Sequence, residues 1–292
     1  MTLLELIERS TGQLSQAGVC FGHGTTNAFD EAAWLVLWRL GLPLDTPLEG
    51  PDSQALRPVS AAEWEQCTTL IQTRISSRKP AAYLTQEAWL QGVSFYIDER
   101  AIVPRSLIAE VLADGTIDAW LSDQTKQVLD LCTGNGSLAV LAGLAWPDVQ
   151  VTGADISRDA LAVAAINMER HDLQERVQLV HSDGLSALPG PFDLILCNPP
   201  YVCQASMDAL PAEYRAEPEL ALAGGADGMD FVRRLFKDAP ARMSEHAVLV
   251  LEIGNEVDHF IAAFPHLEVA WLDTSAGDDQ VLLIARQALL QR

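Results

Sequence analysis

The sequence is poor in basic residues and has no long apolar run. Lysine and arginine together number 19 against 40 aspartates and glutamates, so the formal net charge is -21. A surface this acidic repels a phosphate backbone, which disfavours a direct nucleic-acid partner and favours a basic one, although the charge can also serve solubility alone. No stretch approaches the roughly 18 to 20 apolar residues that span a bilayer, and the first residues lack the basic-then-apolar pattern of a signal peptide. We therefore expect a cytoplasmic protein with no membrane partner.

Cysteine and histidine patterns typical of metal sites are also missing. The five cysteines include no C-x-x-C pair, and Cys132 and Cys197 lie inside apolar strand-like runs. This usage is typical of reduced core cysteines rather than of disulfides or metal ligands. The six histidines are scattered, and Glu256 with His259 forms one helical-turn pair rather than a ligand set. We expect no metal site.

What the sequence does contain first is a set of helical patterns, which predict a small helical domain over residues 1–85. The apolar spacing predicts helices over Leu3–Gln16, over Phe29–Leu40, and from the capping box Ser60-Ala61-Ala62-Glu63 to about Arg78. Residues 41–59 carry four prolines and predict a loop. A linker over 86–105 follows. Its stretch EAWLQGVSFYIDE has two short aromatic and β-branched runs joined through Gly92, which predicts a β-hairpin.

From residue 106 to residue 292, strand-like runs alternate with helical patterns. The predicted strands are Gln127–Cys132, Val149–Ala154, Val177–His181, Phe192–Cys197, Ala247–Ile253, Leu267–Leu272 and Gln280–Ala285. Helical patterns such as Leu138–Ala145 and Arg158–Arg170 lie between them. This order predicts an α/β fold with a doubly wound sheet. The last two runs are too close for a helical crossover, so we expect them to pair antiparallel at one edge.

A glycine-rich turn follows the first of these strands. The stretch VLDLCTGNGSLA places Gly134 and Gly136 where a tight turn and a close backbone approach to a ligand are needed. With Ala139 these glycines satisfy G-x-G-x-x-A, which also fits a dinucleotide fingerprint, and Asp155 at the end of the second strand can hold a ribose hydroxyl pair in either case. The turn alone therefore leaves the ligand open, and a purely structural turn remains an alternative.

The fourth strand of the sheet ends in NPPY, residues 198–201. Prolines lack an N–H and fix φ, so this corner is stiff and offers acceptors with almost no donors. The side-chain oxygen of Asn198 and the carbonyl of Pro199 can each accept one N–H of a planar NH2 group, which aims its lone pair at an S-adenosylmethionine methyl group. The ring of Tyr201 can pack against the flat acceptor group. A nicotinamide enzyme has no use for such a corner.

These motifs together resemble a known family. DLCTGNG, Asp155 in GADIS, HSDG, NPPYV and EPELALAGGADGMD look like the N5-glutamine methyltransferases of the HemK class. The hairpin and its exit, AWLQGVSFYIDERAIVPRSLIAEVL, resemble the branch that methylates a glutamine of ribosomal protein three of the large subunit, where FYVDERVLVPRS is typical. The release-factor branch usually has PR followed by an acidic PDTE-like run, which residues 106–110 lack. The resemblance covers essentially the whole chain.

The resemblance implies a fold, a cofactor and a set of site residues. The fold is a helical N-terminal domain for substrate recognition, a hairpin and a Rossmann-like, seven-stranded methyltransferase domain. The cofactor is S-adenosyl-L-methionine, whose methionine part is cradled by Cys132 to Gly136, whose ribose is held by Asp155 and whose adenine is flanked by Asp183 and Gly184. The implied cofactor-binding set is Asp130, Cys132, Thr133, Gly134, Asn135, Gly136, Asp155, Ile156, Asp183, Gly184 and Asn198.

The substrate side is implied in the same way. Asn198, Pro199, Pro200 and Tyr201 would hold a glutamine, and Asn198, Pro199 and Tyr201 would carry the catalysis. The expected partner is a basic ribosomal protein, free or in early assembly, with no direct nucleic-acid contact. Two departures from the family pattern are Cys132, where the release-factor branch commonly has glycine, and Asn135, where a small Ser or Thr is usual. Pro104-Arg105 lies beside the cofactor in this family, but a linker turn explains the pair equally well.

Other functions remain as alternatives. N5-glutamine methylation of peptide chain release factors uses the same chemistry. NPPY also occurs in adenine-N6 methyltransferases of DNA or RNA, although the net charge of -21 and the lack of a basic stripe stand against that reading. A non-catalytic binding module is the third alternative, and the intact Asn198 and Tyr201 stand against it.

Overall fold

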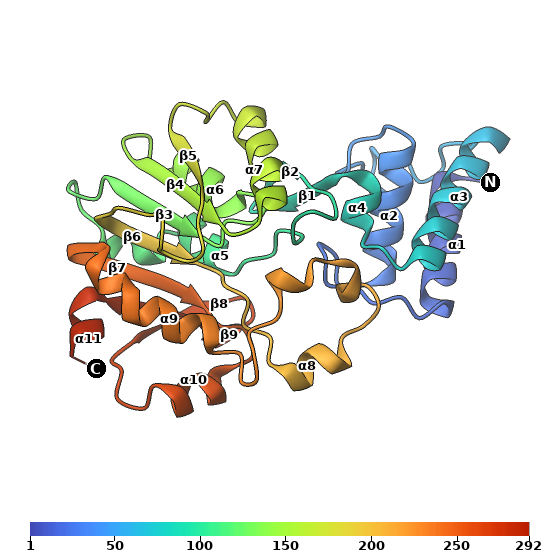
Figure 1. Cartoon of the computed structure of the whole chain (residues 1–292). Coiled ribbons are helices and arrows are strands. Elements are labelled where there is room, and N and C mark those ends of the chain that lie inside the picture. The colour runs from blue at the N-terminus through green and yellow to red at the C-terminus, as the bar shows by residue number, and fades with distance from the viewer. Residues whose placement is uncertain (292) are drawn as a thin grey trace. The chain divides into compact units, whose positions relative to one another are not determined.

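Residues 1–291 are described by the computed structural model of the chain (Figure 1). None of the helices in this range combines the length and the apolar character needed to cross a membrane. The principal feature is a seven-stranded sheet, accompanied by a separate two-stranded hairpin.

The sheet is mostly parallel and has the strand order β5-β4-β3-β6-β7-β9-β8. Its strands are β3 (Gln127–Leu131), β4 (Gln150–Asp155), β5 (Val177–His181), β6 (Phe192–Cys197), β7 (Met243–Glu252), β8 (Ala270–Thr274) and β9 (Gly277–Ala285). The predicted doubly wound sheet is confirmed, as is the antiparallel pairing of the last two strands, with β8 at the edge. The sequence did not indicate that β9 also inserts beside β7, antiparallel to it.

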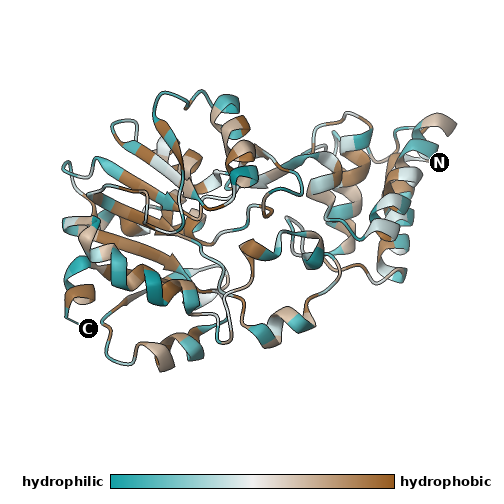
Figure 2. Cartoon of the chain, viewed as in Figure 1, coloured by the Kyte–Doolittle hydropathy of each residue, from teal (hydrophilic) through white to brown (hydrophobic). Residues whose placement is uncertain are grey.

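Helices cover both faces of this sheet because alternate residues of each central strand enter opposite cores. In β6, Leu194 and Leu196 join one core while Ile195 and Cys197 join the other. The first core includes residues of α5 (Ile108–Ala113), α6 (Ser137–Ala145) and α7 (Arg158–Arg170). The second includes residues of α9 (Asp230–Asp238), α10 (Val257–Ala263) and α11 (Arg286–Leu290). Figure 2 shows the strands as a mainly hydrophobic layer, as expected for a sheet buried on both faces.

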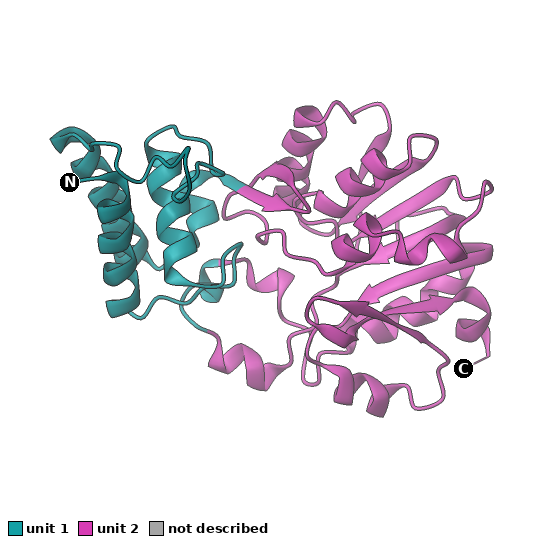
Figure 3. Cartoon of the chain, turned by 180° about the vertical axis from the view of Figure 1, so that it is seen from behind, with its two compact units in different colours: residues 1–87, 211–216 teal, residues 88–210, 217–292 magenta. Residues whose placement is uncertain are grey.

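The chain divides into two compact units (Figure 3). One comprises Met1–Glu87 together with Pro211–Ala216, and the other comprises Ala88–Leu210 together with Glu217–Arg292. The short α8 (Gln204–Ala209) precedes the segment that joins the first unit.

The first unit is helical, as its sequence predicted. It contains α1 (Leu3–Gln16), α2 (Ala28–Arg39), α3 (Ala61–Ser77) and α4 (Ala81–Thr85). The capping box predicted at Ser60 is present, since the Ser60 side chain accepts from the Glu63 N–H and the Glu63 side chain accepts from the Ser60 N–H. A second box, between Thr2 and Glu5, opens α1. Apolar side chains of α1, α2 and α3 form one core.

A buried arginine holds the segment 211–216 in this helical unit. The side chain of Arg74 is 1% exposed; its Nε donates to Glu31 at 2.8 Å and its Nη1 donates to Glu213 at 3.2 Å. Its Nη2 donates to the Cys20 carbonyl at 2.9 Å. Because a buried guanidinium needs partners for its N–H groups, Glu213 fixes the segment at this point.

The predicted hairpin is also present. Strands β1 (Glu87–Leu90) and β2 (Val93–Tyr96) form a two-stranded sheet. Gln91 and Gly92 both have positive φ, 50° and 74°, as a two-residue turn between twisted strands requires.

We predict that Gly136→Ala destabilises the chain by about 2 to 5 kcal/mol, the sum of left-handed strain and overpacking. Gly136 has φ 82°, and a Cβ there would lie 2.7 Å from Met168 Cε and 3.1 Å from Ala164 Cβ. Gly12→Ala is the matched control, because Gly12 is exposed in α1 with nothing within 4 Å of a Cβ. The control should stabilise by about 0.5 to 1 kcal/mol. Urea unfolding measures both, and equal effects would contradict the packing argument.

Candidate active site

The candidate site lies at the carboxyl ends of the parallel strands. From β3 the chain proceeds to β4 and β5 on one side, and it then returns to place β6 on the other side of β3. This reversal is the switch point at which doubly wound sheets bind ligands. The segments that follow β3, β4, β5 and β6 carry the glycine-rich turn, Asp155, Asp183 and Asn198, respectively.

The glycine-rich turn after β3 is tight and is open where a ligand is expected. Cys132, Gly134 and Gly136 all have positive φ, 62°, 56° and 82°. The Gly136 N–H closes the turn on the Thr133 carbonyl at 2.8 Å. A Cβ at Gly134 would meet nothing closer than a side-chain carbon of Ile102 at 3.6 Å. Gly136 is therefore needed for packing, whereas Gly134 leaves space beside the backbone.

Asp155 at the end of β4 is tied to this turn. Its Oδ2 accepts from the Gly134 N–H at 2.9 Å, and its Oδ1 accepts from the Ser157 N–H at 2.8 Å. Each carboxylate oxygen keeps a further lone pair, which suits a pair of ribose hydroxyls. Burial raises the pKa of Asp155 above its ordinary value. The adjacent Ile156 side chain is 44% exposed and offers an apolar surface beside the carboxylate.

Two further observations show that the residues fit a nucleoside-type cofactor. Gly184 has φ 54° and nothing within 4 Å of a Cβ, so the chain after β5 leaves room for a flat group. Asn135 is 2% exposed, yet within residues 1–291 its side-chain Nδ2 has no hydrogen-bond partner. A buried donor without a partner is costly, so a ligand acceptor in the turn would satisfy it.

Other members of the predicted cofactor set face the protein. Asp130 Oδ2 accepts from Thr133 Oγ1 at 2.5 Å and from the Ala139 N–H at 2.9 Å, so both residues hold the turn and the start of α6. Burial raises the pKa of Asp130 to about 7. The thiol of Cys132 lies against Cys197, and this contact together with burial raises the pKa of Cys132 well above its usual range. The side chains of Asp130, Thr133 and Cys132 thus contact other protein groups and hold the backbone of the site in place.

Asp183 is held at the surface. Its carboxylate pairs with Arg234 of α9, with Nη1 and Oδ1 3.1 Å apart, and both side chains are more than half exposed. The predicted adenine contact of Asp183 must therefore coexist with this ion pair or replace it.

The acceptor corner after β6 has oxygens without partners in the described chain. Within the described part of the chain, neither the Asn198 side chain nor the Pro199 carbonyl has a hydrogen-bond partner. Asn198 and Pro200 are half-buried, whereas Pro199 is buried. Two oxygens are thus available to a ligand with two N–H groups.

Tyr201 is fixed by its surroundings. A Cβ at Gly254 would lie 2.5 Å from the Tyr201 ring, and a Cβ at Gly224 would lie 2.7 Å from its Cα. A Cβ at Gly228 would lie 2.2 Å from the Tyr201 carbonyl oxygen. Gly224 and Gly228 of the GGADG motif are therefore explained by close packing around the acceptor corner, whereas a Cβ at Gly225 would collide with the side chain of Asp230.

A residue that the sequence did not single out anchors Tyr201. Glu252, the last residue of β7, is 3% exposed and accepts from the Tyr201 hydroxyl at 3.1 Å. Its other oxygen accepts from Ser106 Oγ at 2.6 Å and from the Leu107 N–H at 2.9 Å. Burial raises the pKa of Glu252. The sequence feature that could have indicated Glu252 is its position as an acidic residue at the end of the apolar run AVLVLE, at the edge of the sheet where ligands bind.

The role of Pro104-Arg105 is also visible. Arg105 makes a bidentate ion pair with Glu217 of the EPEL motif, with both N···O distances 2.7 Å. The Glu217 side chain is fully buried and also accepts from the Val103 N–H at 3.0 Å. Arg105 is thus part of a largely buried ion pair and not only of a linker turn.

Comparison with known proteins identifies the family. A family model described as the methyltransferase small domain matches residues 111–213. A Bordetella pertussis protein named ribosomal protein uL3 glutamine methyltransferase is 52% identical over 291 residues, which cover 99% of this chain and 96% of that protein. The chain belongs to the ribosomal protein uL3 glutamine methyltransferase family.

Further comparisons agree. A Burkholderia pseudomallei protein of the same name is 50% identical and covers 97% of this chain and 94% of its own length. Among solved structures, the hMettl16 catalytic domain in complex with MAT2A 3'UTR hairpin 6 matches with a TM-score of 0.52 at 14% identity, over 77% of this chain and 81% of that one. At 14% identity, the likeness to this solved structure shows the fold alone. As a member of the uL3 glutamine methyltransferase family, the chain is an enzyme whose methyl donor is S-adenosylmethionine.

We predict that the stability cost of Asp130→Asn decreases as pH rises from about 5 to about 8. Asp130 keeps its proton in the folded chain up to a pKa of about 7, whereas an unfolded Asp ionises near about 3.9. The unfolded state therefore binds fewer protons between these values, and the wild type loses stability there as pH rises, by at most about 1.4 kcal/mol per pH unit. Asparagine removes this slope. Urea unfolding of both chains across the range measures the difference, and parallel pH profiles would contradict the assignment.

Proposed function

We propose that this chain transfers the methyl group of S-adenosylmethionine to the side-chain nitrogen N5 of a glutamine in ribosomal protein uL3. The observation that carries this proposal is the pair of unpartnered oxygens, from Asn198 and Pro199, at the end of β6 beside the glycine-rich turn. A glutamine side chain ends in an NH2 with two N–H donors, which matches them in number and kind. The names of the relatives support uL3 as the substrate.

The proposed mechanism relies on orientation. When bound, S-adenosylmethionine supplies an electrophilic methyl group on a positively charged sulfur. Asn198 Oδ1 and the Pro199 carbonyl accept the two N–H groups of the glutamine, which fixes the plane of the amide and aims its nitrogen lone pair. Pro199 and Pro200 keep the corner rigid, and Tyr201, anchored by Glu252, forms its wall.

The cofactor assignments belong to the same proposal. Gly134 and Gly136 would shape the turn that receives the methionine part, and Asn135 Nδ2 would donate to it. Asp155 would accept the ribose hydroxyls. Ile156, Asp183 and Gly184 would border the adenine. The open space at Gly134 and Gly184 supports this placement.

We predict that Asn198→Asp binds S-adenosylmethionine at least as tightly as the wild type but transfers methyl more slowly. The aspartate still accepts hydrogen bonds, yet its charge stabilises the sulfonium ground state more than a transition state in which that charge disperses. Calorimetry gives the affinity and single-turnover kinetics gives the transfer rate. Asp155→Ala is the converse control, since it should weaken cofactor binding by roughly 1.5 to 3 kcal/mol per charge-assisted hydrogen bond lost. Wild-type turnover in Asn198→Asp would show that its role is misassigned.

The substrate state follows from charge. A mature ribosomal subunit presents phosphates that a chain of net charge -21 meets with repulsion, whereas a free ribosomal protein is basic. We infer that the substrate is free uL3 or an early assembly intermediate in the cytoplasm. The enzyme then makes no direct contact with nucleic acid, and its helical unit recognises uL3.

We predict faster methylation of isolated uL3 than of intact large subunits. With isolated uL3 at subsaturating concentration, the rate should fall when salt rises from about 0.05 to about 0.3 M, because ions screen long-range attraction. Mass spectrometry of the product should find one added methyl group on glutamine. A release factor tested in parallel separates the other branch, and an adenine-containing oligonucleotide separates the nucleic-acid alternative. Preference for mature subunits, or indifference to salt, would overturn the inference on substrate state.

A further inference from the structure

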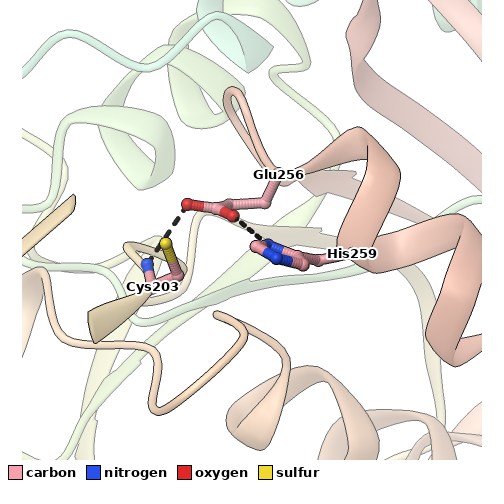
Figure 4. A group of neighbouring side chains, drawn as sticks. All are labelled: Cys203, Glu256 and His259. Carbon is pink, nitrogen blue, oxygen red and sulfur yellow. Dashed lines mark hydrogen bonds and ion pairs between the residues drawn. The ribbon is translucent and has the colours of Figure 1, made fainter. Parts of the chain in front are cut away.

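Three side chains with metal-binding chemistry meet beside the acceptor corner, outside the residues proposed for methyl transfer (Figure 4). Cys203 lies two residues after Tyr201. Glu256 directly precedes α10, and His259 is in the first turn of that helix. One ligand atom from each of Cys203, Glu256 and His259 lies within 4.8 Å of the others. The sequence alone predicted no metal site, because Glu256 and His259 form only a helical-turn pair; the fold adds the thiol.

We propose that Cys203, Glu256 and His259 form a binding site for a zinc ion. Cysteine sulfur, imidazole nitrogen and carboxylate oxygen are the three ligand types that Zn²⁺ uses in proteins. Thiolate ligation also disfavours the hard ions Mg²⁺ and Ca²⁺, which prefer oxygen. Three protein ligands leave the fourth tetrahedral position to water or to Ser206, whose Oγ lies 3.4 Å from Cys203 Sγ.

The present geometry is close to that of a closed site. With bonds of about 2.0 to 2.3 Å, tetrahedral ligand atoms lie about 3.3 to 3.8 Å apart. The widest pair, which lies within 4.8 Å, must therefore approach by at most roughly 1 Å, whereas Glu256 Oε2 and His259 Nδ1, now 2.5 Å apart, must separate by about as much. Cys203 and Glu256 are buried at 6% and 7% exposure and form the fixed side of the site. The His259 side chain is 46% exposed, so it can reorient and the ion has a path of entry.

Glu256 is already oriented by its neighbours. Its Oε1 accepts from the Cys203 N–H at 3.2 Å, and its Oε2 faces His259 Nδ1 at 2.5 Å. Zinc would take the place of the proton between the carboxylate and the imidazole, and that proton would move to Nε2 of the neutral ring. Zinc would also displace the thiol proton, which is released to the buffer, so the sulfur–hydrogen bond is exchanged for a sulfur–zinc bond without any redox step.

The site joins two segments that border Tyr201. Cys203 belongs to the stretch that leaves the acceptor corner, whereas Glu256 follows Gly254, over which the Tyr201 ring packs. A Cβ at Gly228 would lie 3.3 Å from Glu256 Cγ and 2.2 Å from the Tyr201 carbonyl oxygen. A bound ion therefore clamps the exit of the corner to α10 and stabilises the folded chain.

Isothermal titration of the metal-free, full-length chain with zinc chloride tests the site. We expect one ion per chain, proton release in buffers of differing ionisation enthalpy, and a higher melting temperature with zinc. Cys203→Ser and His259→Ala should each weaken zinc binding by roughly 100-fold or more. Changing a group that only orients a metal ligand already costs up to about 100-fold, and these variants remove a ligand itself. Cys20→Ser and His246→Ala are the matched controls, because Cys20 is half-buried and His246 is exposed elsewhere in the chain. They should leave the affinity unchanged.

His259→Ala keeps the test valid if Cys203→Ser fails to fold, since His259 is partly exposed. Cobalt substitution gives an independent readout: a thiolate-to-cobalt charge-transfer band should appear in the wild type and should be lost in Cys203→Ser or weakened in His259→Ala. Equal zinc affinity in the wild type and His259→Ala, or no charge-transfer band with cobalt, would overturn the proposal. Neither readout depends on methyl transfer, so failure here is separate from failure of the proposed function.

Discussion

Glu252 accepts three hydrogen bonds in a fully buried position, from Ser106 Oγ, the Leu107 N–H and the Tyr201 hydroxyl. A carboxyl group removed from water must find partners within the protein, and here the partners come from the segment after the hairpin and from the acceptor corner. One side chain at the end of β7 therefore fixes two chain segments that the sheet alone would leave unattached. The rigidity of Tyr201, and with it the shape of the proposed glutamine pocket, depends on this contact.

The same requirement recurs around the site. Glu217 satisfies Arg105 and the Val103 N–H, so the EPEL motif holds the segment that precedes Ser106. In the helical unit, Arg74 donates a hydrogen bond to Glu213, which precedes Glu217 by four residues in the chain. The stretch that follows the acceptor corner is thus held by two successive buried carboxylates, one in each compact unit. The sequence pattern does not show why the EPEL motif is present. In the structure its first residue, Glu217, is a buried carboxylate that accepts hydrogen bonds from Arg105 and from the Val103 N–H.

Close packing supplies the second constraint. Gly224, Gly228 and Gly254 stand where any Cβ would collide with Tyr201, so the corner is enclosed by backbone rather than by side chains. Backbone enclosure leaves little freedom for the corner to move, which suits a reaction that depends on aiming one nitrogen lone pair. The proposed zinc ion would add a further clamp at the exit of the same corner.

The sequence by itself determined the seven strands, the longer helices and the motifs at the edge where ligands bind. Apolar periodicity, capping boxes and turn residues are local signals, so α1, α2 and α3 of the helical unit, the hairpin and all seven strands of the sheet could be predicted. The glycine-rich turn, Asp155 and NPPY lie at the predicted edge of the sheet. Only the tertiary structure decided which polar side chains hold these motifs in place. Ser106 and Glu252 are 146 residues apart, and Arg74 and Glu213 are 139 residues apart, so no local pattern links them. The same holds for Cys203, which reaches Glu256 and His259 only because β6 and β7 are neighbours. Periodicity reports which face of an element is buried, but the partner of a buried charge is chosen by the fold that encloses it.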